Sequence, residues 1–131
     1  MNPKDLLYAE THEWVRVAPE GGRKVATIGI TAFAIQQLTD LVHMVLPKVG
    51  TQVKAGTPFG EVESVKAVSD LYSPVDGEVI AVHGELPGKL ETLGSDPYGE
   101  GWMIKVALSD ESALKNLMDA AAYEKQCAAE G

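Results

Sequence analysis

Glycine and proline punctuate this chain at short intervals, mostly between residues 19 and 101. Thirteen glycines and seven prolines occur in 131 residues, and most of them fall in that interval. Neither residue suits a helix interior, and both are common in tight turns. The stretches between them are short and rich in β-branched residues, which favour strands. This spacing predicts a mainly β fold built from short strands joined by turns.

The first two predicted strands form a hairpin over residues 13–30, because the Pro19-Glu20-Gly21-Gly22 segment between them is typical of a turn. A second pair of strands meets near Val65 and Lys66, and Ser73-Pro74 ends that unit. The predicted strands cover residues 14–17, 24–30, 41–46, 59–65, 67–72, 78–82 and 102–108.

Helices are predicted in two places. Thr31 precedes a short helical stretch, and its hydroxyl can accept an amide hydrogen bond, so we expect it to cap a helix over residues 32–38. Residues 111–127 are rich in Ala, Leu, Lys and Glu and predict one or two C-terminal helices. Residues 83–95 contain a Pro-Gly pair and a further glycine, and they predict a loop.

The length of the chain suits one domain over residues 1–131, with a core at about 6–108 and a helical tail at about 110–128. Eleven basic and nineteen acidic residues give a net charge of −8 and a pI near 4.8. Nucleic acids and anionic membranes are bound by basic surfaces, so neither is an expected partner. This balance suits a soluble, monomeric shuttle protein.

No targeting or membrane segment is apparent. Residues 1–13 lack the apolar core of a signal peptide and the Arg- and Ser-rich composition of a transit peptide. The apolar stretch at residues 41–46 is far too short to cross a bilayer. We expect a cytoplasmic protein, or the mature form of an organellar one.

The sequence contains no convincing catalytic group. Its three histidines, His12, His43 and His83, are far apart and have no metal-ligand spacing, so hydrogen-bonded or surface roles are favoured. The single cysteine, Cys127, lies in the polar tail and excludes an internal disulfide. Alternate residues such as Glu61 and Glu63 share one face of a strand, which solvent exposure explains better than an acid–base pair. We therefore predict a protein that is not an enzyme.

One lysine has an unusual position. Lys66 falls where two β-rich runs meet, in the segment Phe59-Gly-Glu-Val-Glu-Ser-Val-Lys-Ala-Val-Ser-Asp-Leu-Tyr-Ser-Pro74. A lysine at a hairpin tip is exposed, and its ammonium group can be acylated without any change in the core. An ordinary solvated lysine would have the same spacing, so the position alone does not assign a role.

The segments around this lysine resemble those of the glycine cleavage H-protein family. The resemblance includes the Thr11-His-Glu-Trp-Val15 opening and the Ala26-Thr-Ile-Gly-Ile-Thr31 strand. It continues through Val62-Glu-Ser-Val-Lys-Ala67, Ser69-Asp-Leu-Tyr-Ser-Pro74 and Asp96-Pro-Tyr-Gly-Glu-Gly-Trp102, in the family's order over about residues 6–125. Differences occur at His43, Val45 and the Lys89-Leu90 pair, all outside the lysine hairpin.

The resemblance implies a β-sandwich of the lipoyl/biotinyl type, a barrel-sandwich hybrid, with lipoic acid in amide linkage on Lys66. The lipoyl arm would accept an aminomethyl group from a pyridoxal-phosphate glycine decarboxylase. It would deliver that group to a tetrahydrofolate-dependent aminomethyltransferase and be reoxidised by dihydrolipoyl dehydrogenase. A lipoyl ligase or transferase would attach the arm. Such a carrier works in the bacterial cytoplasm or, as a mature eukaryotic form, in the mitochondrial matrix.

The resemblance also implies a cleft for the arm. The family's carboxylates in that cleft correspond here to Glu13 and Asp70, and Thr11 adds a hydroxyl. These groups suit a cationic amine, which binds best to carboxylates and other acceptors. Surface ion pairs or caps would also explain the three residues.

Two other carrier roles remain open. The protein could be a lipoyl relay for other enzymes, or a lipoyl or biotinyl domain of another multienzyme complex. Biotin acceptors usually have Met on both sides of the lysine, whereas Val65 and Ala67 flank Lys66 here. Acyltransferase lipoyl domains usually have Asp directly before the lysine and lack the Asp96–Trp102 segment. A β interaction module without any acyl group is the third alternative, and the intact mass of the native protein distinguishes it.

Overall fold

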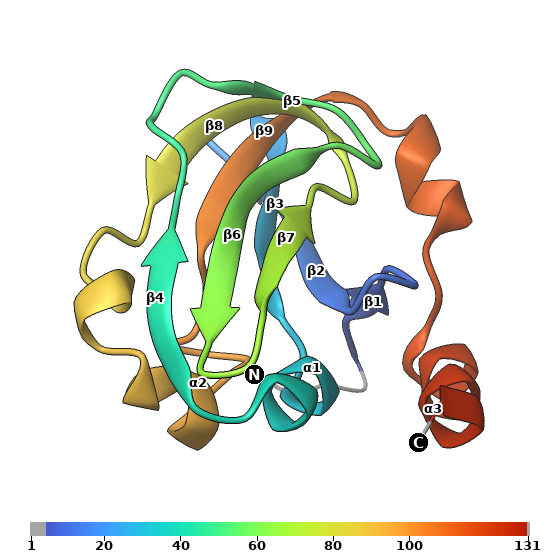
Figure 1. The fold of residues 1–131 in the computed structure, drawn as a ribbon. Coiled ribbons are helices and arrows are strands. Elements are labelled where there is room, and N and C mark those ends of the chain that lie inside the picture. The colour runs from blue at the N-terminus through green and yellow to red at the C-terminus, as the bar shows by residue number, and fades with distance from the viewer. Residues whose placement is uncertain (1–4, 131) are drawn as a thin grey trace.

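Two antiparallel sheets pack face to face, as Figure 1 shows for the computed structural model, which describes residues 5–130. The larger sheet has the order β1-β2-β3-β9-β8-β5, and the smaller sheet has the order β4-β6-β7. The mainly β sandwich predicted from the sequence is therefore confirmed. The strands of the larger sheet are Leu7–Tyr8 (β1), Glu13–Glu20 (β2), Arg23–Ile30 (β3), Ile104–Asp110 (β9), Asp76–Val82 (β8) and Gln52–Val53 (β5); those of the smaller sheet are Leu41–Val45 (β4), Pro58–Ser64 (β6) and Val68–Tyr72 (β7).

The helices lie around the sandwich rather than within it (Figure 1). The predicted cap is confirmed, because the amide of Ala34 donates to Thr31 Oγ1 over 3.2 Å at the start of the internal helix. None of the helices within residues 5–130 has the length and apolar character needed to cross a bilayer. The helical elements are Ala32–Leu38 (α1), Leu86–Gly88 (η2), Glu91–Ser95 (α2), Ser112–Asn116 (η3) and Ala120–Glu130 (α3).

The prediction of a loop over residues 83–95 was wrong, because η2 and α2 form there. Leu86 and Leu93 are 1% and 0% exposed. Both belong to the main core, and burying them against the sandwich stabilises helical turns that this Pro- and Gly-containing segment does not favour locally.

The strands β1 and β5 were not predicted, because each is only two residues long. They exist through pairing with distant strands, β1 with β2 and β5 with β8. The predicted turn at residues 19–22 is also shorter than expected. Glu20 pairs with Arg23, which leaves a two-residue turn of Gly21 and Gly22 with φ angles of 61° and 82°. Glycine adopts these positive angles without steric cost, so the hairpin continues further than the proline suggested.

The apolar core has two parts, one on each face of the larger sheet. The main part fills the space between the sheets and includes Val15, Ile28, Val62, Leu71 and Ile104. The second part lies beneath the N-terminal strand and α3 and consists of Leu6, Tyr8, Trp14 and Tyr123. Because Trp14 and Val15 point to opposite faces, β2 is buried on both sides at this point.

The indole of Trp14 depends on a glycine on the adjacent strand. Trp14 is fully buried, pairs with Gly29 across the β2–β3 ladder, and donates from Nε1 to the carbonyl of Pro97 over 3.0 Å. A Cβ atom on Gly29 would lie 2.7 Å from the indole ring. The indole therefore occupies the space that any larger residue at position 29 would need.

We expect Gly29→Ala to destabilise the protein by about 1–3 kcal/mol, because overpacking forces the buried indole or its strand to move. Chemical denaturation gives the free energy of unfolding. Gly84→Ala is the matched control, since nothing lies within 4 Å of a Cβ atom there. Equal free energies of unfolding for the two variants would contradict the packing argument.

Candidate functional site

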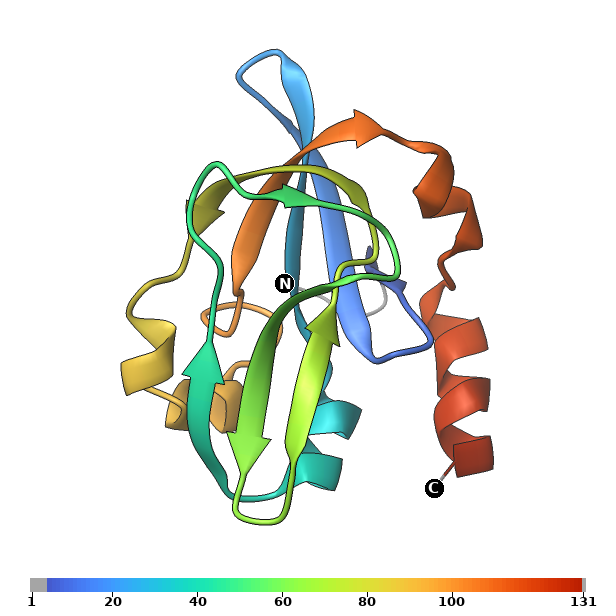
Figure 2. The same cartoon turned by 45° about the horizontal axis from the view of Figure 1, so that its top comes forward.

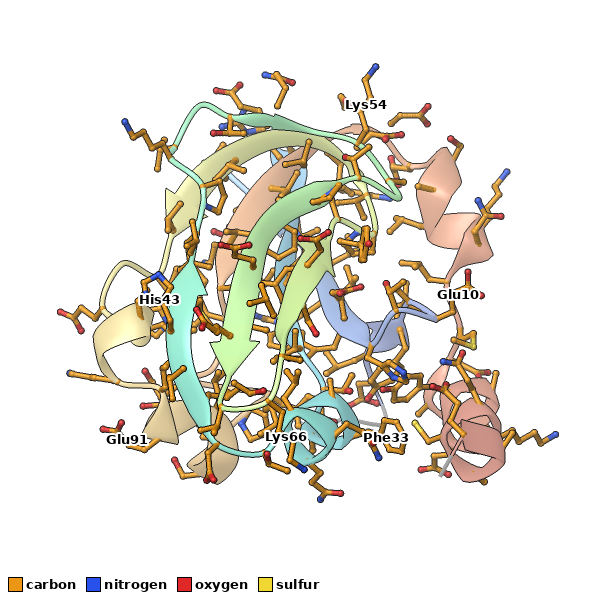
Figure 3. The ribbon with its side chains drawn as sticks, viewed as in Figure 1. Glu10, Phe33, His43, Lys54, Lys66 and Glu91 are labelled. Carbon is orange, nitrogen blue, oxygen red and sulfur yellow. The ribbon has the colours of Figure 1, made fainter. Side chains whose placement is uncertain are left out.

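Lys66 lies at the exposed tip of the β6–β7 hairpin. Figure 3 shows it at the end of the smaller sheet, close to α1. Figure 2 shows that this tip and the β2–β3 turn lie at opposite ends of the molecule. The predicted position of Lys66 between two strands is therefore correct, and its amino group is open to solvent and to other proteins.

The hydroxyl of the buried Ser64 holds the backbone of this tip. The amides of Lys66 and Ala67 both lie 3.2 Å from Ser64 Oγ, and they donate to it. The Ser64 amide donates to the carbonyl of Ala67 over 2.8 Å, and the Val65 amide donates to the carbonyl of Asp40 over 3.0 Å. The tip is thus a backbone held by hydrogen bonds that presents an exposed lysine side chain. Sequence reasoning missed Ser64, although a serine just before a two-residue turn was a signal for it.

The strands below the tip are anchored by their inward side chains. Val62 of β6 and Leu71 of β7 are buried in the main core, while Glu61 and Glu63 are half-buried on the opposite face. Glu61 pairs with Asp70 on the neighbouring strand. The alternation predicted for Glu61 and Glu63 is confirmed.

A cavity of about 300 Å³ lies between β7, α1 and the turn that precedes β2. Its apolar wall includes Ile30, Phe33, Leu38 and Leu71. Its polar groups include Thr11, His12, Glu13, Asp70 and Glu130. The structure therefore brings together all three predicted cleft residues, Thr11, Glu13 and Asp70, although β2 and β7 are far apart in sequence. Lys66 does not line the cavity but belongs to the hairpin whose second strand forms its edge.

Glu13 is the most buried ionisable group in this cavity, with 1% of its surface exposed. The hydroxyl of Thr11 donates to Glu13 Oε1, and the amide of Tyr72 donates to Oε2 over 3.3 Å. Burial raises the pKa of Glu13 to about 7, and the hydrogen bonds from Thr11, from the Tyr72 amide and from its own backbone oppose that increase only partly. The carboxyl group is therefore able to take up or release a proton near neutral pH.

The other lining groups differ in how far the sequence could indicate them. Asp70 is exposed at the cavity edge, as expected for the outer face of β7. His12 and Glu130 were not predicted to line a cleft. Glu130 reaches the cavity only because α3 packs back across residues 9–13, and no local pattern in the tail indicates that packing.

The buried Glu13 predicts a specific pH dependence of stability. Its pKa is about 7 in the folded chain and 4.5 for an unperturbed glutamate, so the folded state binds this proton more tightly. The resulting stabilisation is complete below pH 4.5 and is lost as the pH rises to about 7. We expect Glu13→Gln to gain about 3 kcal/mol in free energy of unfolding relative to the wild type between pH 4.5 and 8. Denaturation curves at each pH measure this difference, and parallel pH profiles for the two proteins would contradict it.

Comparison with known proteins gives one consistent result. The glycine cleavage H-protein family matches residues 6–130. The chain is similar to the glycine cleavage system H protein of Rhodopirellula baltica, with 59% identity over 99% of this chain and 98% of that protein. It is also similar to the H protein of Marinobacter nauticus, with 52% identity over 98% and 96% of the two chains.

A solved structure agrees with the sequence relatives. The crystal structure of a glycine cleavage system H protein from Mycobacterium marinum superposes with a TM-score of 0.82 and 38% identity, over 95% of this chain and 98% of that one. The predicted lipoyl-type fold is thereby confirmed. Because sequence and fold match over nearly the whole chain, the protein belongs to the glycine cleavage H-protein family, the lipoyl carriers of the glycine cleavage system.

Proposed function

We propose that Lys66 is the residue that carries lipoic acid, in amide linkage to Nζ, and that the chain acts as a carrier without catalysing a reaction itself. The observation that carries this proposal is the exposed lysine on a hairpin tip whose backbone is held by Ser64. When bound, the lipoyl group supplies a dithiolane that accepts and releases the aminomethyl group of glycine. The protein's own contribution is to present this group at a high effective concentration to enzymes that hold other cofactors.

The cavity beside the hairpin fits such a group. Its volume of about 300 Å³ is at the lower end of small-molecule sites. An apolar wall of Ile30, Phe33 and Leu38 suits a hydrocarbon chain, and the polar end at Thr11 and Glu13 suits a cationic amine. This distribution of lining groups supports a resting place for the arm in which its cargo is screened from water.

Each carboxyl group at the polar end of the cavity has its own proposed role. Glu13 is held by Thr11 and the Tyr72 amide and provides a carboxyl group that lines the cavity. This carboxyl group is buried, so little water reaches it. Asp70 provides a second carboxylate from the opposite strand at the open edge. An exposed charge pair contributes only about 0–1 kcal/mol, so Glu13 contributes more to retention of the cargo than Asp70 does.

The proposed partners follow from the family. They are the pyridoxal-phosphate glycine decarboxylase, the aminomethyltransferase, dihydrolipoyl dehydrogenase and the ligase or transferase that attaches lipoate. For a bacterial host such as those of the relatives above, we place the reaction in the cytoplasm. Reconstituted glycine decarboxylation with the purified partners is the direct test of this function.

Lys66→Arg should fold normally but carry no lipoyl group and support no glycine decarboxylation, because arginine keeps the charge and lacks an acylatable amine. Intact mass, peptide mapping and the reconstituted assay measure these outcomes. Lys54→Arg, which changes an exposed lysine near the opposite end of the sandwich (Figure 3), is the control and should behave as the wild type does. A lipoyl group mapped to Lys54 or Lys105 would overturn the assignment.

Glu13→Gln should leave lipoylation intact and shorten the time for which the carrier retains its aminomethyl cargo by about tenfold, which corresponds to roughly 1.4 kcal/mol. Asp70→Asn should shorten it less than about fivefold, because Asp70 is exposed. The release of ammonia and formaldehyde from the isolated, loaded carrier measures both effects. Glu20→Gln, at the far end of β2, is the matched control. Retention times equal to the wild type in both variants would remove these carboxylates from the site.

A further inference from the structure

His12 lies between the cavity residues Thr11 and Glu13, and its backbone has a conformation that residues other than glycine rarely adopt. Its φ angle is 76°, in the left-handed region that glycine adopts freely and that other residues, mainly Asn, Asp and His, adopt uncommonly. This conformation is strained for a residue that has a Cβ atom, so surrounding interactions must hold it. The proposed function gives His12 no task, although its side chain lines the cavity.

Backbone hydrogen bonds account for part of this restraint. The amide of His12 donates to the carbonyl of Ala9 over 3.0 Å, and the amide of Thr31 donates to the carbonyl of His12 over 3.0 Å. The amide of Ala9 also donates to the carbonyl of Glu13 over 2.9 Å. The turn over residues 9–13 is thereby closed on itself and tied to the start of α1.

The imidazole of His12 joins this turn to the C-terminal helix. Its Nδ1 atom lies 2.7 Å from the hydroxyl of Tyr123, which in turn lies 2.6 Å from Thr31 Oγ1. Its Nε2 atom lies 3.1 Å from Glu130 Oε1. Tyr123 is itself fixed, being 5% exposed and stacked on Tyr8 at 4.5 Å between ring centres. Both nitrogens of the ring therefore contact α3.

A second side chain of α3 strengthens the same connection. Gln126 Nε2 donates to the carbonyl of Glu10 over 2.8 Å and to Glu130 Oε2 over 2.7 Å. The hydrogen bond from Gln126 and, to a lesser extent, the one with His12 lower the pKa of Glu130. Glu130 therefore remains ionised beside the imidazole. The helix α3 is thus hydrogen-bonded to the turn at both Glu10 and His12.

We propose that His12 is a positioning residue of the cavity proposed for the lipoyl arm. Its imidazole fixes the segment that contains Thr11 and Glu13 to α3 through Tyr123 and Glu130. The C-terminal helix thereby determines how far the Glu13 carboxyl is shielded from water. This inference rests on the proposed function, because Glu13 is the group there assigned to the cargo. The proposed role of Glu13 then depends on α3 as well, although this helix lies outside the sandwich.

Loss of the His12 imidazole should change the hydration of the Glu13 carboxyl group. The ionisable side chains that line the cavity with it are His12, Asp70 and Glu130, and Asp70 is not in the hydrogen-bonded chain. Without the imidazole, the turn is free to leave its strained conformation and water gains access to the carboxyl group. Because burial is the main cause of the raised pKa of Glu13, hydration lowers that pKa toward its ordinary value.

The test is the pKa of Glu13, measured by NMR of carboxyl-labelled glutamate in the full-length chain without lipoate. His12→Asn removes the imidazole while keeping a residue that tolerates the left-handed conformation. Tyr123→Phe removes only the hydroxyl and keeps the stack on Tyr8. In both variants we expect the pKa of Glu13 to fall by about one pH unit or more. Glu20→Gln should leave it unchanged.

The same variants, lipoylated and loaded, should lose their cargo several-fold faster than the wild type. If the pKa of Glu13 stays at the wild-type value in both variants while their melting temperatures fall, His12 has a structural role only and the proposal is overturned. If the pKa falls but cargo retention is unchanged, His12 positions Glu13 as inferred, and the cargo role of Glu13 fails instead. Should His12→Asn not fold, Tyr123→Phe decides the question alone.

Discussion

The burial of the first residues of β2 on both faces is the constraint on which the rest of this structure depends. Val15 packs between the sheets, while Trp14 fills the space above Gly29 and joins the second core. A strand held on both sides has little freedom to slide or rotate. Glu13, the first residue of this strand, is therefore held inside the protein as well, where a carboxyl group would otherwise not lie.

The β6–β7 hairpin combines a backbone held by hydrogen bonds with an exposed lysine side chain at its tip. Inward side chains on β6 and β7 anchor the hairpin in the core, and Ser64 satisfies the amides at its tip. The side chain of Lys66 extends from this held backbone and is exposed. This arrangement suits the proposed attachment of lipoate at Lys66, because the attachment point would keep its place while the attached group moved between the cavity and other enzymes.

The groove is made by parts that are remote in the chain. The turn before β2 supplies Thr11, the first residue of β2 is Glu13, α1 supplies Phe33 and β7 supplies Asp70. The tail closes the assembly, because α3 binds the turn through a chain of hydrogen bonds rather than through a large apolar face, and Tyr123 is its only buried residue. A helix attached in this way affects the groove without belonging to the sandwich.

The sequence by itself determined the strand-rich architecture, the cap at Thr31, the hairpin with Lys66 and the family. These features depend on local patterns, such as glycine and proline spacing, alternation and contiguous motifs. Only the tertiary structure decided that residues 83–95 form helical turns, that β1 and β5 exist, that Ser64 binds the hairpin tip, and that His12 and Glu130 line the cavity. Each of these depends on a partner far away in the chain, and burial or pairing with that partner outweighs the weak local preference.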